Sequence, residues 1–355
     1  MASDQAGLTK IRAEVARALD EFLTRQRAGL AAIGDDMLPW IDTMTGLLGG
    51  GKRLRPAFCY WGWRAAGGPD CPQIYTAAAA LELLHASALV HDDVMDASDT
   101  RRGRPAVHRQ FASRLAQAGF GDGADAFGAG AAILIGDVLL SWTDELYHSS
   151  GLPPEVLQRG QPVLDAMRTE VAAGQYLDLV NQVTRSDSVE SAMRVVRYKT
   201  AKYTIERPLH LGAAMAGAGE AVAAVCTDYG IPLGTAFQLR DDILGIFGDP
   251  AITGKPVTGD ISEGKRTVLM ALATERANSA QLRVLDRYVG DRRLTEAGAA
   301  EVRAVITDTG ALDECETLID ASVKEATAAL DGALITEEAR EALTELAVLS
   351  TARAD

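Results

Sequence analysis

The chain has 355 residues, and its 35 basic and 49 acidic side chains give a formal net charge of −14 and a pI near 4.9. This acidity repels polyanions, so we expect no nucleic-acid partner and no general attraction to anionic membranes. Hydrophobic residues make up 47% and charged residues 24%, a globular composition that excludes intrinsic disorder. The charged N-terminus has no apolar signal core, and no uncharged apolar run approaches the ~20 residues of a membrane helix. These features predict a cytoplasmic protein without a transmembrane segment.

The hydrophobic pattern along the chain is helical. Apolar residues recur at steps of three and four from Leu8 to Phe22, which predicts an amphipathic helix. The same period returns between Gly- and Pro-rich breaks, and strand-like alternation is not evident. Three stretches with few charges are expected to be helices buried on most sides: 74–90, 124–140 and 207–216. No linker or repeat divides the chain, so we predict an all-α fold and one domain over residues 1–355.

The most informative stretch runs from Glu82 to Asp96, where an apolar run ends in the carboxylates Asp92, Asp93 and Asp96. On a helix, Asp92 and Asp96 share a face one turn apart and repel each other unless a cation lies between them. Hard oxygen ligands suit Mg²⁺, which takes its remaining ligands from water and substrate phosphates. The four cysteines and five histidines show no zinc-ligand spacing. Alone, this pattern is also compatible with a solvated acidic helix end.

A second acidic pair, Asp241 and Asp242, follows another apolar run. Two such pairs facing one another across a helical bundle would hold several Mg²⁺ ions. Lys and Arg gather in short separate clusters at 50–56, 101–103, 199–202, 253–255 and 264–266. Any one of these clusters is compatible with plain surface charge. Combined with the aspartates, they describe a site for two anionic diphosphates.

In this order, the segments GGKRLRP, HDDVMDASDTRRG, YKTAKYT, FQLRDD, TGKP and EGKRT resemble the trans-isoprenyl diphosphate synthases, or polyprenyl synthetases. The resemblance runs from about Gly50 to Leu269. It implies a single helical bundle around a deep central cavity. It also implies head-to-tail 1′–4 condensation of isopentenyl diphosphate with a C5–C15 allylic diphosphate. The cofactor implied is Mg²⁺, about three ions per active site, with Mn²⁺ as a substitute. A homodimer is expected as well, because the helix around 124–140 is too apolar to leave in water.

Carried over position by position, the resemblance assigns roles to individual residues. The Mg²⁺ ligands toward the allylic diphosphate are Asp92, Asp96 and Asp241, supported by Asp93 and Asp242. Residues expected to bind the allylic diphosphate are Arg101, Lys199 and Lys255, and those for isopentenyl diphosphate are Lys52, Arg55, His85 and Arg102. Lys265 is a further substrate-binding candidate, and Thr200 and Gln238 are expected beside the developing carbocation. His85 is also compatible with a buried core histidine.

One position departs from the family pattern. Gly245 stands where many members carry the third aspartate of the second motif, which bears on binding of the third metal ion.

Product length is expected to depend on the helix below Asp92. Ala88 lies four residues, about 6 Å, deeper on nearly the same face, and Ser87 borders it. Both side chains are small, so Leu84 and Leu81 are the next candidates for the floor of a tunnel. Small residues here are also compatible with close helix packing.

We expect a C20 product, geranylgeranyl diphosphate, with C15 farnesyl or a longer polyprenyl diphosphate as alternatives. A class I terpene cyclase is less expected because it lacks the second diphosphate that GGKRLRP would bind. A non-catalytic prenyl synthase subunit is less expected because both aspartate pairs are present.

Overall fold

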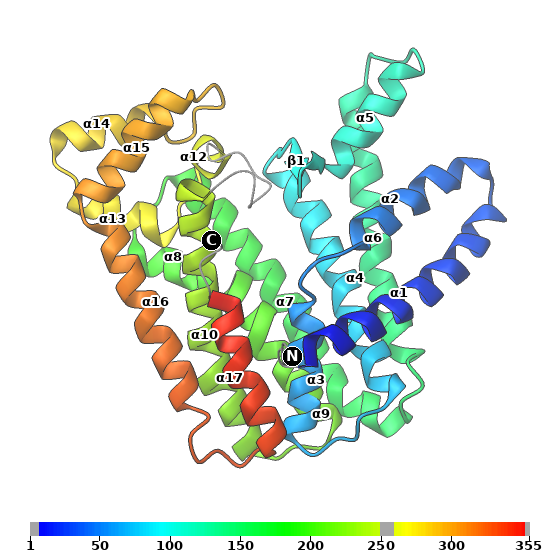
Figure 1. Ribbon diagram of the computed structural model, residues 1–355. Coiled ribbons are helices and arrows are strands. Elements are labelled where there is room, and N and C mark those ends of the chain that lie inside the picture. Colours follow the sequence, from blue (N-terminus) through cyan, green and yellow to red (C-terminus); the bar gives the residue numbers. More distant parts are fainter. Residues whose placement is uncertain (1–6, 249–258, 352–355) are drawn as a thin grey trace. The chain divides into compact units, whose positions relative to one another are not determined.

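The computed structural model describes residues 7–248 and 259–351 (Figure 1). The regular secondary structure of the described residues is helical apart from one short two-stranded hairpin, so the predicted all-α class is confirmed. The chain forms two compact units, each assembled from separate segments. Unit 1 comprises Met1–Pro162, Pro208–Val222 and Ile335–Leu343, and unit 2 comprises Val163–Arg207, Ala223–Leu334 and Thr344–Asp355. The single domain predicted for residues 1–355 remains a prediction.

Unit 1 contains the N-terminal helices. Its elements are α1 (Leu8–Ala31), the 3-10 helix η2 (Asp35–Met37), α2 (Leu38–Leu48), α3 (Leu54–Ala65), α4 (Pro72–Met95), β1 (Thr100–Arg101), β2 (Arg104–Pro105), α5 (Val107–Gln117), α6 (Ala124–His148), α9 (Arg207–Met215) after its first residue, and the first parts of α7 (Pro154–Thr184) and α17 (Glu337–Thr351). The predicted amphipathic helix is confirmed as α1, whose apolar stripe from Leu8 to Phe22 is buried.

Helix α4 is the core helix of unit 1. It begins with Pro72 in its first turn, where the missing N–H costs no intrahelical bond, and it contacts α1, α3 and α6. Most of its side chains between Ile74 and Val90 are buried, as the sequence predicts. The helix ends at Met95, so its C-terminal turn carries the first aspartate motif.

The expectation that residues 124–140 are buried on most sides is wrong within unit 1. These residues form the first part of α6, which packs against α4 and α5 but leaves Phe127, Ile133 and Leu134 exposed by 45–60%. By length and composition alone, α4 and α6 are each apolar enough to cross a membrane. Because most of α4 is buried inside the unit, this pair of helices does not mark the chain as a membrane protein.

Unit 2 is built around α10. Its elements are the remainder of α7, α8 (Val189–Val195), the π-helix η3 (Val196–Glu206), α10 (Glu220–Phe247) from Ala223 onward, α12 (Gly259–Glu263), α13 (Val268–Arg276), α14 (Ser279–Tyr288), α15 (Glu296–Asp308), α16 (Ala311–Ala328) and the end of α17. Ala236, Leu239 and Ile243 of α10 join a buried core with α12 to α16. This core holds the turn of α10 that carries the second aspartate pair.

Helices α3 and α9 cross within unit 1 at two glycines. A Cβ atom on Gly62 would lie 2.1 Å from the carbonyl oxygen of Leu209, and one on Gly212 would lie 1.9 Å from that of Cys59. Both obstacles are backbone atoms, which cannot rotate aside as a side chain can. The crossing therefore requires glycine at both positions.

We predict that Gly62→Ala lowers the free energy of unfolding by about 1–3 kcal/mol or more, because the added methyl group overpacks this crossing. Gly29→Ala is the matched control, since a Cβ there meets nothing within 4 Å in the last turn of α1. The free energy of unfolding of the control variant should rise by about 0.5–1 kcal/mol. Urea denaturation measures the stability of both variants. Equal stability of the wild type and the two variants would contradict the requirement for glycine at this crossing.

Candidate active site

The first aspartate motif lies at the C-terminal end of α4. Asp92 and Asp93 belong to its last turn, and Asp96 caps the helix, with its backbone N–H donating to the carbonyl oxygen of Asp92 at 2.8 Å. Asp93 and Asp96 are only 2% and 4% exposed, whereas Asp92 remains partly accessible. The three predicted carboxylates are thus gathered on one turn of chain.

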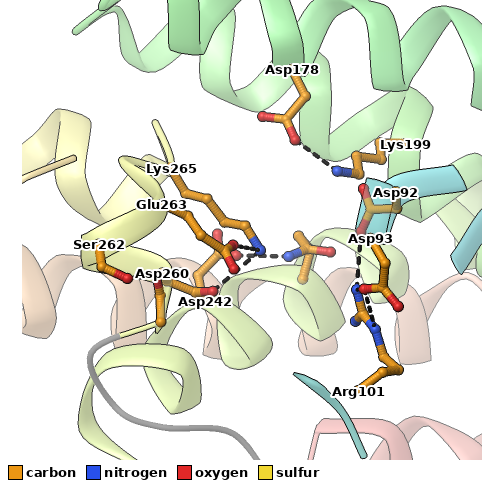
Figure 2. Close-up of polar contacts among 12 residues, drawn as sticks. Asp92, Asp93, Arg101, Asp178, Lys199, Asp242, Asp260, Ser262, Glu263 and Lys265 are labelled. Atoms are coloured by element: carbon orange, nitrogen blue, oxygen red, sulfur yellow. Dashed lines mark hydrogen bonds and ion pairs between the residues drawn. The ribbon is translucent and has the colours of Figure 1, made fainter. Parts of the chain in front are cut away.

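A short hairpin directs Arg101 to these carboxylates. β1 and β2 pair Arg101 with Arg104, and Arg102 and Gly103 form the turn with φ of 52° and 72°, the positive values of a primed hairpin turn. Arg101 Nε donates to Asp93 Oδ1 at 2.8 Å, and Nη2 donates to Asp93 and, at 3.3 Å, to Asp92 Oδ2 (Figure 2). The sequence did not predict this strand pairing.

The pKa of Asp93 reflects a balance between burial and Arg101. Burial raises the pKa of this carboxyl, and the negative charge of Asp92 adds to the increase. The hydrogen bonds and positive charge of Arg101 act in the opposite direction. Arg101 therefore offsets part of the cost of keeping a second carboxylate behind Asp92, which fits a supporting role for Asp93.

We call Arg55, His85, Arg101 and Arg102 the basic cluster, because unit 1 brings these four predicted residues together. Burial and the positive charges of Arg55, Arg102 and Arg101 all lower the pKa of His85 well below its usual value. Burial, opposed by Glu82, also lowers the pKa of Arg102. His85 is therefore a neutral imidazole beside three guanidinium groups, an environment that favours a multiply charged anion.

Lys52 lies on the exposed loop that leads to this cluster, where its backbone oxygen accepts from Arg12 Nε at 3.2 Å. Its neighbour Arg53 points inward instead, forms a buried ion pair with Glu82 and donates to the carbonyl oxygen of Leu48. Sequence reasoning missed Arg53. The available signal was Glu82, a lone acid in an apolar helix that needs a buried cationic partner.

The second cluster of predicted residues lies in unit 2 on η3 and α10. Lys199 and Thr200 lie on η3, an 11-residue π-helix, and such helices are rare and concentrated at functional sites. Lys199 Nζ is 2.7 Å from Asp178 Oδ2 on α7 (Figure 2). α7 approaches η3 closely at Gly174, where a Cβ would lie 2.4 Å from the backbone nitrogen of Lys199. Asp178 was not predicted, because a contact between two separate helices produces no recognisable spacing in the sequence.

A hydrogen-bond chain links η3 to the second aspartate motif. Thr200 Oγ1 donates to Gln238 Oε1 at 2.5 Å, and Gln238 Nε2 donates to Asp242 Oδ1 at 2.7 Å. Asp242 is 6% exposed, and burial raises its pKa well above the usual value. The hydrogen bond from Gln238 opposes this increase, and the charge of Asp241 reinforces it. Asp241, the predicted metal ligand, is exposed.

Lys199, Thr200, Gln238 and the second aspartate pair border a pocket within unit 2. Its polar lining residues are Asp178, Lys199, Thr200, Gln238, Asp241, Asp242, Asp260, Lys265, Arg266 and Thr267. Lys265 Nζ lies 3.2 Å from both Asp260 Oδ1 and Glu263 Oε2 (Figure 2). Lys255, the remaining predicted cation, lies outside the described residues.

The donor set fits Mg²⁺ that is shared with a substrate. Within residues 7–248 and 259–351, no three His, Cys, Asp or Glu side chains converge as the ligands of one ion. The available donors are aspartate oxygens, which suit a hard cation that keeps waters and completes its shell with substrate phosphates. The sequence assigns this role to Asp92 and Asp96 in unit 1 and to Asp241 in unit 2, and the assignment stays a prediction.

The predicted chain-length residues differ in exposure. Ala88, one turn below Asp92 on α4, is partly exposed. Ser87, Leu84 and Leu81 are buried, with exposures of 3%, 3% and 0%. Ala88 is thus the one member of this set that offers more than marginal surface to a growing chain.

The chain is similar in sequence to known proteins. Residues 39–306 match the family described as Polyprenyl synthetase. The chain belongs to this family. A geranylgeranyl diphosphate synthase of Mycobacterium tuberculosis is 31% identical over 333 residues, which cover 93% of this chain and 89% of that protein. A geranylfarnesyl diphosphate synthase of Aeropyrum pernix is 34% identical over 272 residues, covering 76% and 79%.

A solved structure is also closely similar. The geranylgeranyl pyrophosphate synthase of Corynebacterium glutamicum, complexed with isoprenyl diphosphate and magnesium, has a TM-score of 0.94 and 41% identity over 98% of this chain and 99% of that one. The polyprenyl synthetase described here is therefore a trans-prenyltransferase, a prenyl diphosphate synthase. The relatives are named for products of different length, so the family alone does not fix the product.

The buried carboxylate of Asp242 predicts a specific effect on stability. The pKa of Asp242 is raised in the folded protein. The free energy of unfolding therefore falls as the pH rises from the unfolded pKa of ~4 to the folded pKa, because the buried carboxyl must then ionise. Asp242→Asn keeps an oxygen that accepts from Gln238 and removes this cost. In metal-free buffer at pH 7 the variant should melt at a higher temperature than the wild type, and the difference should vanish toward pH 4. Exposed Asp241→Asn should change melting less, and a variant at 242 that melts lower at pH 7 would contradict this electrostatic account.

Proposed function

We propose that this polyprenyl synthetase makes geranylgeranyl diphosphate by Mg²⁺-dependent 1′–4 condensation of isopentenyl diphosphate with allylic diphosphates. The single observation that carries the C20 assignment is Ala88, a small and partly exposed side chain one turn below Asp92. A methyl group there leaves room for later isoprene units. The geranylgeranyl names of two of the relatives support the same product.

On the allylic side, we assign diphosphate binding to Arg101, Lys199 and Lys255, and binding of three Mg²⁺ ions to Asp92, Asp96 and Asp241. When bound, the metal supplies electrostatic stabilisation of the leaving diphosphate. Arg101 and Lys199 add fixed positive charge as the C–O bond ionises. Lys199 is held for this task by Asp178 at 2.7 Å.

On the isopentenyl side, we assign the diphosphate to Lys52 and the basic cluster. Arg55 and Arg102 bring the planar donor forks that match phosphate oxygens. His85 stays neutral among these guanidiniums and acts as a hydrogen-bonding group. An anion would offset the mutual repulsion of the cluster.

The carbocation step needs few protein groups. Thr200 and Gln238 offer oxygen dipoles to the cation, and their mutual hydrogen bond of 2.5 Å fixes their orientation. The isopentenyl double bond attacks the cation, and the departing diphosphate takes the proton that is lost. Apolar residues of α4 exclude water, which would otherwise quench the cation.

The exposed apolar face of α6 supports a homodimer as part of the proposal. Phe127, Ile133 and Leu134 form this face, and large exposed apolar patches are typical of protein–protein contacts. A second copy of the chain would cover it. We also propose a cytoplasmic location, because the acidic chain with thiol cysteines suits a reducing compartment.

Direct assay tests the proposed reaction. With isopentenyl diphosphate and C5, C10 or C15 primers, we expect geranylgeranyl diphosphate, and excess chelator should abolish its formation until Mg²⁺ is restored. Arg55→Ala should raise mainly the KM for isopentenyl diphosphate, and Lys199→Ala mainly that for the allylic substrate, each by about 10- to 100-fold. Surface variant Arg17→Ala is the control. Equal changes in both KM values for Arg55→Ala and Lys199→Ala would contradict the assignment of separate sites.

Chain length has its own test. In Ala88→Phe, the ring should occupy the space of the later isoprene units, so C15 or C10 products should replace C20. Overpacking costs about 1–3 kcal/mol, which a fold of this size tolerates. Leu84→Ala should lengthen the product, and Ala88→Ser should leave it unchanged. Chromatography of dephosphorylated products measures this, and a C20 product from folded, active Ala88→Phe would overturn the proposed role of this helix face.

A further inference from the structure

The second aspartate motif ends at Gly245 on α10, and a neighbouring side chain takes up the space above this glycine. Residue 245 is four positions after Asp241 and therefore lies one turn further on the same helix face. A Cβ atom on Gly245 would lie 1.9 Å from Asp260 Oδ2 and 2.9 Å from its Cγ. The carboxylate of Asp260 thus stands where a side chain at position 245 would begin.

Asp260 is held firmly in this place. It lies at the start of α12, and the next residue, Ile261, is 1% exposed in the core of unit 2. The backbone nitrogen of Gly290 donates to the carbonyl oxygen of Ile261 at 2.8 Å, which ties α12 to the segment after α14. Lys265 reinforces the position twice, through its backbone nitrogen to the carbonyl oxygen of Asp260 at 3.1 Å and through its ammonium group to the carboxylate.

Asp260 also belongs to the pocket of the proposed metal–diphosphate site. It lines that pocket together with Asp241, Asp242 and Lys199. Its negative charge adds to the increase in the pKa of Asp242. The carboxylate is 13% exposed, so it lies between the surface and the core. Lys265 is an ionic partner of opposite charge, and it also contacts Glu263.

We propose that Asp260 supplies the carboxylate that the second motif lacks at position 245, and that position 245 is glycine because Asp260 stands over it. The carboxylates of this motif that face the metal are then Asp241 and Asp260, from two different helices. This inference rests on the proposed function. It accounts for the glycine at position 245 by the space that the Asp260 carboxylate occupies.

Four variants test the inference, with Mn²⁺ affinity measured by electron paramagnetic resonance in the presence of a non-ionising allylic thiolodiphosphate. Asp260→Asn should weaken Mn²⁺ binding on the order of 10- to 100-fold. Gly245→Ala should weaken it similarly, although Gly to Ala within a helix usually stabilises, because the methyl group displaces Asp260. The double variant Gly245→Asp with Asp260→Gly should recover affinity, since the carboxylate is restored from α10. Glu263→Gln is the control and should bind as the wild type does, because it alters only the other partner of Lys265.

The two proposals fail in different ways. Unchanged Mn²⁺ affinity in folded Asp260→Asn, or a double variant no better than Asp260→Asn, would overturn the role of Asp260 in an enzyme that still makes prenyl diphosphates. Wild-type protein that forms no prenyl product would instead overturn the proposed function. Circular dichroism of each variant separates loss of the fold from loss of the site.

Discussion

The site depends on like charges that the fold gathers where little water reaches them. In unit 1, the positive charges of four arginines, Arg53 and the three of the basic cluster, act on a neutral His85. In unit 2, the charges of Asp241 and Asp260 act on the buried Asp242. Such groups repel strongly in a low-dielectric environment, and burial disfavours their charged forms. A metal–diphosphate complex carries both signs of charge. Binding of such a complex would therefore offset a repulsion that the folded protein maintains by itself, and we propose that this favours diphosphates as ligands.

Several ion pairs do not face substrate but keep these charges in position. Arg53 and Glu82 tie the loop before α3 to α4 from inside the core. Arg240, directly before the second motif, binds Glu316 of α16 through both terminal nitrogens at 2.7 and 2.8 Å. Removing one partner of a buried pair costs far more stability than the pair contributes, because the other charge is left buried alone. Packing arrangements that separate these partners are therefore disfavoured. Each contact lies near site residues of its own unit: the first near the basic cluster in unit 1 and the second next to Asp241 in unit 2.

The sequence alone predicted the features that are local in the chain. The helical period identified α1, and the spacing of Asp92 and Asp96 placed them on one turn at the end of α4. It could not predict contacts between distant segments, such as Lys199 with Asp178 or Asp260 over Gly245, because these depend on how helices pack. The sequence analysis also overestimated the burial of α6, because an apolar helix has the same sequence pattern whether it faces a core or a partner. The hairpin of Arg101 was missed because each strand has only two residues.

In the proposed site, protein carboxylates and the substrate diphosphate hold the metal jointly. Titration of the wild-type protein with Mn²⁺, with and without a non-ionising allylic thiolodiphosphate, tests it most directly. Because no three described acidic, histidine or cysteine side chains converge on one point, we expect weak Mn²⁺ binding alone and at least about tenfold tighter binding with the diphosphate. Tight binding without diphosphate, or equal affinity in both titrations, would contradict it.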